Sequence, residues 1–255
     1  MMLEVRNLVK HFGGVRAVDG LDFKIQQGEV FGLIGPNGSG KSTTVNLVCG
    51  VFPPTDGEIL LDGIDLGAIA PHRRVDAGIA RTFQNIRLFG ELTVWQNLWV
   101  AWRDNPGHEQ GWVSNWFGRS TSRRQEIQQL LEFSGLGDKA DHLASNLAFG
   151  EQRRLELARA MAAKPKLILL DEPAAGMNSA EIKDLCQRVL AMKEMGMTVL
   201  LVEHVMELVM NVTDRITVLN FGKPIAQGTP IEIQNNEIVQ EAYFGSSDNA
   251  QGGVS

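Results

Sequence analysis

The sequence predicts an α/β fold, because short β-branched and aliphatic runs alternate with helical patterns along most of its 255 residues. A second observation is the segment 30–49, in which an apolar run leads through a glycine-rich turn into a helical pattern. A third is the stretch 90–162, which contains no convincing strand and breaks the alternation. We therefore predict a sheet domain with a mainly helical sub-domain inserted into it.

The individual elements follow from apolar periodicity and from turn residues. Strands are expected at 3–9, 20–25, 30–34, 58–61, 78–82, 167–171, 197–202, 215–220 and 224–227. Helices are expected at 41–49, 93–102, 122–134, 150–162, 179–195, 204–210, 230–234 and 237–243. Thr93 with Gln96 predicts a capping box, and Thr229 before Pro230 predicts another capped helix start.

Composition excludes several classes of protein. Hydrophobic residues make up 44% and charged residues 21%, which is typical of a globular chain, and a net charge of −6 gives no sign of nucleic-acid binding. The longest apolar runs hold four or five residues, whereas a membrane-spanning helix needs about 20. We expect that the chain does not cross a membrane by itself, and that Cys49 and Cys186 are buried free thiols.

The strongest motif is G-x-x-x-x-G-K-S at 35–42, placed between a predicted strand and a predicted helix. Its glycines let the backbone N–H groups converge on phosphates, Lys41 adds a positive charge, and Ser42 offers a hydroxyl to Mg²⁺. A glycine-rich turn with an incidental lysine is the alternative, and the strand and helix on either side make it remote. The residues expected to bind ATP here are Gly35, Pro36, Asn37, Gly38, Ser39, Gly40, Lys41, Ser42 and Thr43.

Two further apolar strands end in polar residues. "LILLDE" places Asp171 and Glu172 at a strand's carboxyl end, where open α/β sheets bind ligands. Behind a phosphate-binding loop, Asp171 is expected to hold Mg²⁺ through water and Glu172 to polarise the attacking water. "TVLLVEH" ends in His204, which is either structural or, as we favour, a contact for the γ-phosphate. Gln84 follows another strand-like run and is weak evidence alone.

A second anion-binding feature lies in "LAFGEQRRLELARA", where Gly150 precedes a helical pattern. Free N–H groups at a helix start attract anions. The chain thus carries two candidate phosphate-binding features more than a hundred residues apart. The first alone could bind the phosphates of an ATP, so the second requires an explanation.

These elements in this order resemble the ATP-binding cassette family across residues 3–245. The resemblance implies a P-loop ATPase fold with a mixed sheet core, an inserted helical sub-domain and an antiparallel β sub-domain. Residues 1–89 and 163–245 would form the nucleotide-binding core, 90–162 the helical sub-domain, and 246–255 a disordered tail; within the sub-domain, 104–121 reads as a long surface loop. Mg²⁺ would be held by Ser42, Gln84 and Asp171, and Glu172, His204 and Gln84 would be catalytic.

The resemblance also explains the second feature. It makes Leu147–Glu151 the counterpart of the family's L-S-G-G-Q signature, so that Ala148, Phe149, Gly150 and Glu151 would close over ATP held by a second chain. Ala148 lacks the family's serine hydroxyl, Phe149 replaces glycine, and Glu151 is assigned a positioning role. The dimer-contact loop reads Ala175, Gly176, Met177 and Asn178 where the family has S-A-L-D. Phe12 would stack on adenine, although a strand-end core residue is a serious alternative.

Longer stretches, among them "RTFQNIRLFGELTVWQNL" and "GTPIEIQNNEIVQEAYFG", look like the ATP-binding subunits of bacterial branched-chain amino-acid importers. That resemblance implies a second ATPase chain (identical or paralogous), two membrane permease subunits, an external binding protein and a peripheral location on the cytoplasmic face of the inner membrane. Alternatives are a urea or amide importer, a lipopolysaccharide-export ATPase and, from another class, a soluble regulatory ATPase.

Two apolar groups between 84 and 102 receive different interpretations. Trp95 and Trp99 share one helical face and are expected to pack in the core of the helical sub-domain. Ile86, Leu88 and Phe89 lie in a connecting segment, and in the resembling family this segment forms the groove that receives a permease's cytoplasmic helix.

Overall fold

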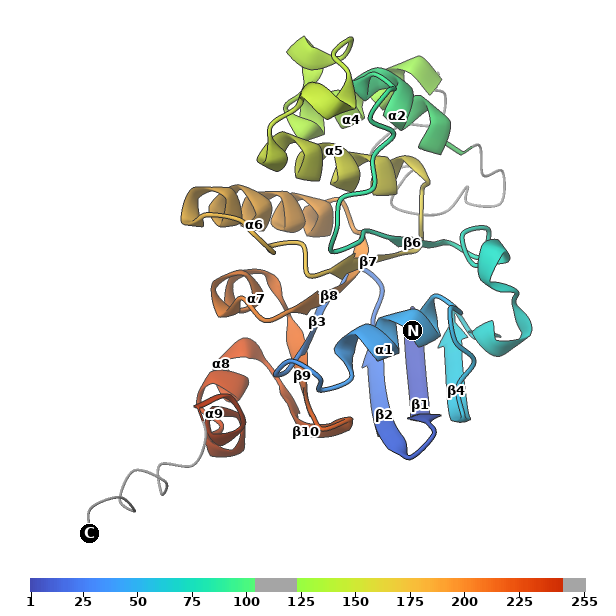
Figure 1. Cartoon of the computed structure of the whole chain (residues 1–255), viewed down its shortest axis with the longest axis vertical. Helices are drawn as coiled ribbons and strands as arrows, with labels where there is room; N and C mark the ends of the chain where they lie inside the picture. The colour runs from blue at the N-terminus through green and yellow to red at the C-terminus, as the bar shows by residue number, and fades with distance from the viewer. Residues whose placement is uncertain (104–122, 245–255) are drawn as a thin grey trace.

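The computed structural model describes residues 1–103 and 123–244, and it shows two sheets with helices between and around them (Figure 1). The four-stranded antiparallel sheet has the order β2-β1-β4-β5, and the six-stranded sheet has the order β10-β9-β3-β8-β7-β6. Their strands are β1 (Leu3–Phe12), β2 (Val15–Ile25), β3 (Val30–Ile34), β4 (Asp56–Leu61), β5 (Ile64–Asp65), β6 (Ile79–Arg81), β7 (Leu167–Asp171), β8 (Thr198–Glu203), β9 (Arg215–Asn220) and β10 (Lys223–Gly228). The predicted fold class, a mixed sheet with an antiparallel sub-domain, is confirmed.

The six-stranded sheet is parallel except for β10, which pairs antiparallel with β9. Every residue of β3, β7 and β8 is buried, as expected for strands covered on both faces. Successive side chains of β8 point to opposite faces of the sheet. Leu200 and Val202 join the core shared with α1 (Lys41–Val48) and the four-stranded sheet. Val199 and Leu201 join the core on the opposite face, which includes residues of α6 (Ser179–Glu194).

The helical part between 90 and 162 stands at one end of the molecule in Figure 1. It comprises α2 (Val94–Ala101), α4 (Arg123–Ser134) and α5 (Phe149–Ala162), with short 3₁₀ turns at Gly137–Lys139 and Ala144–Asn146. Leu98, Ile127 and Leu155 are fully buried where these helices meet. Trp95 and Trp99 stack with 4.6 Å between ring centroids and pack against this core, as predicted.

The remaining helices are α7 (Met206–Val212), α8 (Pro230–Gln234) and α9 (Glu237–Phe244). The predicted capping box at Thr93 and the predicted N-cap at Thr229 are confirmed: Thr93 Oγ1 accepts from the Gln96 N–H at 3.2 Å, and Thr229 Oγ1 accepts from the Glu232 N–H at 3.4 Å. The α8–α9 pair covers a third apolar cluster that includes Ile34, the last residue of β3.

The structure corrects several predicted elements. The helix expected at 204–210 begins at Met206, because the N–H groups of His204 and Val205 are bound by the Glu203 carboxylate instead of entering the helix. The strand expected at 20–25 starts at Val15, since cross-strand pairing with β1 overrides the poor strand preference of the Asp19-Gly20 pair. The two-residue strand β5 and the 3₁₀ turns had no signal we recognised.

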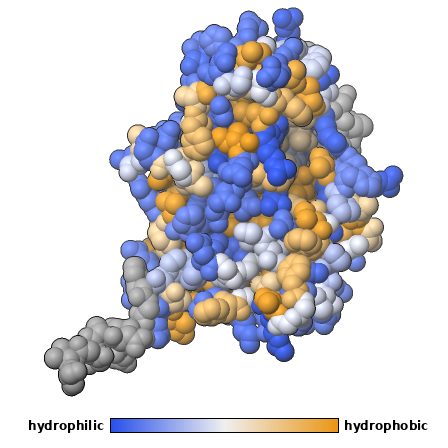
Figure 2. All heavy atoms as spheres, in the orientation of Figure 1, coloured by the Kyte–Doolittle hydropathy of each residue, from blue (hydrophilic) through white to orange (hydrophobic). Residues whose placement is uncertain are grey.

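The surface is mixed in character. The face shown in Figure 2 carries scattered apolar groups. Polar residues separate these groups and are concentrated across the middle of this face. No helix in the described ranges is long and apolar enough to cross a membrane. Cys49 and Cys186 are free thiols, partly rather than fully buried, and burial raises the pKa of both. The predicted loop 104–121 and tail 246–255 lie outside the described residues.

Candidate nucleotide-binding and catalytic site

The loop at 35–42 curls between β3 and α1 in a shape that only glycine permits at two positions. Gly35 and Gly40 have φ of 152° and 106°. A Cβ at Gly35 would lie 2.1 Å from the Leu219 carbonyl oxygen, and one at Gly40 would lie 2.4 Å from the Ala17 carbonyl oxygen. The loop therefore packs its backbone directly onto β9 and β2.

A cavity of about 320 Å³ opens over this loop. Its lining comprises Val15, Arg16, Ala17, the run 37–43, Glu172 and Phe221. Lys41 is buried, and its Nζ donates to the carbonyl oxygens of Gly35 at 2.7 Å and Pro36 at 3.0 Å. Burial lowers the pKa of Lys41, and the nearby carboxylates of Glu172, Glu203 and Asp171 oppose that effect. A phosphate in the cavity would meet both this cation and the free N–H groups that begin α1.

The three predicted catalytic side chains meet at Glu172, which lines this cavity. Gln84 Nε2 donates to Glu172 Oε2 at 2.9 Å, and His204 Nδ1 lies 4.0 Å from the same oxygen. Glu172 has a φ of 46°, a left-handed conformation that is costly for a residue with a side chain. The Glu172 carboxylate is thus held by a strained turn beside the cavity that Lys41 lines.

Asp171 lies beside Glu172 but faces a cation. Arg81 Nη2 is 2.6 Å from Asp171 Oδ2, and Arg81 Nη1 donates to Asn46 Oδ1 at 2.8 Å. Both charged side chains are largely buried. The pair ties β6 to β7 and to α1, and it occupies one of the two Asp171 oxygens.

The residues expected to hold Mg²⁺ are consistent with a weakly ligated ion. Within the described ranges no three His, Cys, Asp or Glu residues gather as a metal cluster. Mg²⁺ commonly takes one or two protein oxygens and completes its shell with water and phosphate oxygens. The exposed Ser42 hydroxyl in the cavity, the second Asp171 oxygen and the Gln84 amide oxygen suit that chemistry.

A buried ion pair connects the helical part to the Gln84 segment. Arg153 and Glu156 of α5 are almost fully buried and lie 2.7 Å apart. Arg153 donates to the carbonyl oxygens of Phe83 and Gln84, both at 2.9 Å, and Glu156 accepts from the N–H groups of Phe83 and Arg87 at 3.5 and 3.4 Å. Burial raises the pKa of Glu156, and Arg153 opposes the shift. The backbone that carries Gln84 is therefore fixed to α5.

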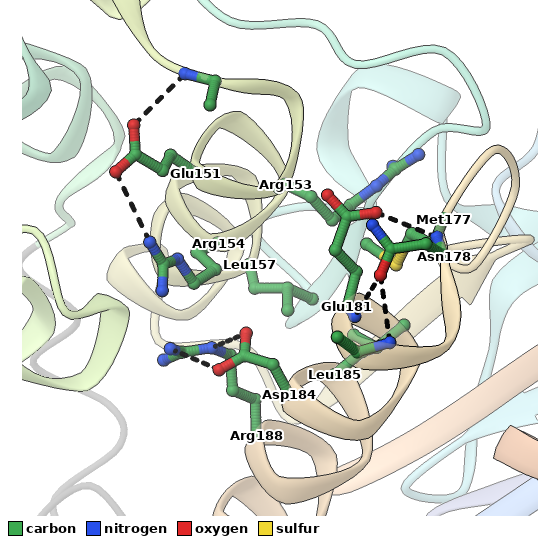
Figure 3. A pocket seen from close by; sticks show the side chains of 13 residues that line it. Glu151, Arg153, Arg154, Leu157, Met177, Asn178, Glu181, Asp184, Leu185 and Arg188 are labelled. Carbon is green, nitrogen blue, oxygen red and sulfur yellow. Dashed lines mark hydrogen bonds and ion pairs between the residues drawn. The ribbon is translucent and has the colours of Figure 1, made fainter.

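A second cavity, of about 400 Å³, separates α5 from the start of α6 (Figure 3). Ala148, Gly150 and Glu151 lie on one side of it and Met177 and Asn178 on the other. Glu151 Oε2 accepts from the Ala148 N–H at 3.1 Å. Its Oε1 lies 2.6 Å from Lys139 Nζ, and this bond lowers the pKa of Glu151. Glu151 therefore caps its own helix and is not directed at a phosphate.

The dimer-loop residues surround the first turn of α6. Asn178 Oδ1 accepts from the N–H groups of Ala180 and Glu181 at 2.9 and 3.1 Å, and Glu181 Oε2 accepts from the Asn178 N–H at 2.9 Å. Gly176 has a φ of 77° and lies near the ring of Phe149, which is 44% exposed. A Cβ at Gly150 would come within 3.0 Å of Glu181 Oε1. The segments 148–151 and 175–178, which the resemblance assigns to the signature and the dimer loop, thus face each other within one chain.

The structure does not bring together all of the predicted residues. Phe12 is absent from the lining of the loop cavity; its ring meets Phe52 edge-on at 5.2 Å, and Lys10 Nζ lies 5.0 Å from its centroid. The aromatic side chain in the lining is Phe221, which is 85% exposed. Among the described residues, the two cavities share no lining residue.

Sequence reasoning missed several residues that organise the site. They are Arg81, Arg153, Glu156, Glu203 and Phe221. Arg153 and Glu156 stand at a spacing of three in α5, which is a usable signal for an ion pair. Glu203 ends an apolar strand and directly precedes His204, and a buried charged residue there needs hydrogen-bonding partners. Arg81 and Phe221 had no signal that we recognise.

Comparison with known proteins identifies the family. A family model described as "ABC transporter" matches residues 18–175, which is more than half of the chain. The chain belongs to the ABC transporter family. It is an ATP-binding cassette that hydrolyses ATP in support of transport. A second model, "Branched-chain amino acid ATP-binding cassette transporter", matches residues 223–249.

Individual members of the ABC family match along nearly their whole length. The high-affinity branched-chain amino acid transport ATP-binding protein LivG of Escherichia coli is 42% identical, covering 96% of this chain and 98% of the relative. BraF of Pseudomonas aeruginosa, which carries the same description, is 41% identical with the same coverage. A nucleotide-free ATP-binding cassette from an ABC transporter superposes with a TM-score of 0.81 at 32% identity, covering 96% of this chain and 99% of that one.

The position of Glu172 generates the first prediction. Glu172→Gln keeps the size of the side chain but removes the base, so we expect ATP to bind with little change while hydrolysis falls about 100-fold or more. Equilibrium titration with Mg-ATP and a phosphate-release assay measure the two effects separately. Lys41→Ala is the matched control, since removing the buried cation weakens binding itself. Wild-type hydrolysis by Glu172→Gln would exclude Glu172 as the base.

The capping geometry of Asn178 generates the second prediction. Because Asn178 Oδ1 only accepts hydrogen bonds, Asn178→Asp preserves both bonds and adds a charge that the helix N-terminus favours. We expect it to retain stability and most ATPase activity. Asn178→Ala loses the cap and lowers the free energy of unfolding by about 1 kcal/mol. Urea denaturation followed by circular dichroism compares the three proteins; equal destabilisation by both substitutions would contradict the capping role.

Proposed function

We propose that this chain is the ATP-hydrolysing subunit of a multi-subunit importer for branched-chain or other hydrophobic amino acids. The observation that carries the proposal is the meeting of Gln84 and His204 at Glu172, which lines the Lys41 cavity, in a chain 41–42% identical to ATP-binding proteins of branched-chain amino acid transport. The match of residues 223–249 to the branched-chain transporter model supports the same solute class.

Each predicted residue has a role in this proposal. Backbone N–H groups of 37–43 and the Lys41 ammonium bind the phosphates of ATP, while Ser42, Asp171 and Gln84 hold Mg²⁺, which would neutralise phosphate charge. Glu172 accepts the proton of the attacking water, and His204 and Gln84 orient the γ-phosphate. Phe221, which is exposed and lines the cavity, is proposed as an aromatic contact for the adenine of ATP, beside the predicted Phe12, which is partly exposed and lies outside that lining.

Two chains are needed to complete each ATP site. The signature residues Ala148 and Gly150 border a cavity separate from the one that Lys41 lines, so we infer that within one chain they do not cover the phosphates. We propose that they cover ATP bound by a second ATPase subunit, identical or paralogous. Closing the two chains would exclude water from the γ-phosphates and strengthen the electrostatic contacts there.

A permease-docking surface is proposed around Phe89. Its backbone is fixed by the buried Asn97, which accepts from the Phe89 N–H and donates to its carbonyl oxygen, both at 3.0 Å, while the ring is 51% exposed. The Arg159 guanidinium lies 5.5 Å from the ring centroid and also lines a cavity of about 320 Å³ with Val75 and Ala101. Leu88 packs against the helical core instead. An apolar cavity with cations at its edge suits an amphipathic helix.

The partners of the complex are proposed to be two integral-membrane permeases and, indirectly, an external solute-binding protein. The chain would then work at the cytoplasmic face of the cell membrane of a bacterium, without nucleic acid. A relative 33% identical, the lipopolysaccharide export system ATP-binding protein LptB of Haemophilus influenzae, favours a second candidate function in export.

The proposal is tested by isolating the chain from membranes with its partners and reconstituting the complex in liposomes. We expect ATP-dependent uptake of labelled leucine, isoleucine or valine. Uptake of urea or short amides instead, or co-purification with lipopolysaccharide-export components, would replace the proposed solute. Recovery of an active ATPase with no membrane partner would point to a soluble regulatory ATPase.

The exposure of Phe89 generates a further prediction. Phe89→Asp places a charge on the proposed docking surface, so we expect a folded chain with unchanged ATP binding and loss of permease co-purification or of coupled uptake. Ile231→Asp is the matched control, because Ile231 is 71% exposed on α8 and does not line the cavity that contains Arg159. Normal uptake and co-purification by Phe89→Asp would exclude this surface.

A further inference from the structure

Glu203 is a carboxylate with no access to water. It is the last residue of β8, its exposed fraction is zero, and the strand before it is buried along its whole length. Moving an ionised carboxylate out of water is costly unless several hydrogen bonds compensate for the lost hydration. The contacts of Glu203 therefore indicate what keeps it there.

Both of its oxygens accept from backbone N–H groups in two different loops. Oε1 accepts from the Ala174 N–H at 2.7 Å, in the loop that follows β7. Oε2 accepts from the N–H groups of His204 at 2.8 Å and Val205 at 3.1 Å, in the loop that follows β8. Hydrogen bonds to an ionised acceptor are the strong ones, and three of them meet on one side chain.

The two loops are those that carry the proposed base and the proposed γ-phosphate ligand. Glu172 lies two residues before Ala174, in a left-handed conformation that persists only where its surroundings hold it. Its own N–H donates to the Val202 carbonyl oxygen at 2.8 Å. The next hydrogen bond between this turn and β8 is the one that the Ala174 N–H donates to Glu203 Oε1.

We propose that Glu203 is a positioning residue for ATP hydrolysis, whose buried carboxylate fixes the loop of Glu172 against the loop of His204. The proposal rests on the catalytic roles proposed above for those two residues. Glu203 Oε2 also lies 3.7 Å from His204 Nδ1, so the carboxylate contacts the His204 side chain as well as the backbone of both loops. It would act by setting the distance between His204 and Glu172. The 4.0 Å separation of His204 Nδ1 and Glu172 Oε2 is the distance it maintains.

A different effect of Glu203 has to be separated from this one. Its charge is among those that favour the protonated form of Lys41, so its removal could weaken phosphate binding. The two effects differ in what they change: an effect through Lys41 lowers the affinity for ATP, whereas displacement of Glu172 and His204 lowers kcat at saturating ATP.

The test is Glu203→Gln in the full-length chain. The amide keeps the shape but offers one acceptor oxygen and turns an NH₂ group towards N–H donors. We expect kcat for ATP to fall about tenfold or more, while the Kd for Mg-ATP changes less than about twofold. Glu203→Asp keeps the charge on a shorter side chain, so its kcat is expected to lie between those of the wild type and Glu203→Gln. If Glu203→Gln does not fold, Glu203→Asp is the variant compared with the wild type.

Glu29→Gln is the matched control. Glu29 is also buried and charged, accepts from the Gln26 N–H at 2.6 Å and lies 2.6 Å from Arg215, but it stands just before β3, at the opposite end of the strands. We expect Glu29→Gln to lower the Tm without lowering kcat. An equal loss of kcat in both variants would assign Glu203 a purely structural role and overturn the proposal.

A double-mutant cycle completes the test. In a Glu172→Gln background, adding Glu203→Gln is expected to cause little further loss of the residual hydrolysis, because the residue it positions no longer acts. Fully additive losses, an unchanged kcat in Glu203→Gln, or a fall in ATP affinity that accounts for the whole effect would each contradict positioning. Wild-type activity in Glu172→Gln alone would instead refute the role of Glu172, which the single variant reports separately.

Discussion

The parallel register of β3, β8 and β7 is the constraint on which the rest of the molecule depends. Ile34 pairs with Glu203, and Val202 pairs with Asp171, so three strands end at the same level of the sheet. The phosphate-binding loop, the His204 loop and the Glu172 turn therefore begin side by side although they are far apart in the sequence. A slip of one residue in either pairing would send alternate side chains to the wrong face and separate these loops.

Buried charged groups near this edge of the sheet hold the neighbouring loops in fixed positions relative to one another. Arg81 with Asp171 ties β6 to β7, Glu203 ties the loops after β7 and β8, and Lys41 binds its own loop. Each of these groups is costly to bury and is compensated by several bonds. The site is consequently organised by polar contacts within an apolar sheet, and the apolar cores on the two faces of the sheet keep water from competing for them.

Much of this was predictable from local signals. The glycine-rich loop, the capping boxes and the buried strands each depend on residues close together in the sequence, and the structure has them where the pattern placed them. The start of α7 was mispredicted because Glu203 takes the N–H groups of two residues that the helical pattern included. Arg81 bonds Asp171, 90 residues away, and Arg153 bonds the Phe83 carbonyl oxygen, 70 residues away. No local pattern identifies these distant partners, although the spacing of Arg153 and Glu156 is a local signal for their ion pair. The ring of Phe12 meets Phe52, a contact that only tertiary packing determines.

The clamp formed by Arg153 and Glu156 has a consequence for motion. It fastens the backbone on either side of Gln84 to α5, while the Gln84 side chain is bonded to Glu172, which belongs to the sheet. Gln84 thus connects the helical part to the sheet: several hydrogen bonds hold its backbone to α5, and one hydrogen bond joins its side chain to Glu172. A tilt of the helical part relative to the sheet would therefore stretch the hydrogen bond between Gln84 and Glu172.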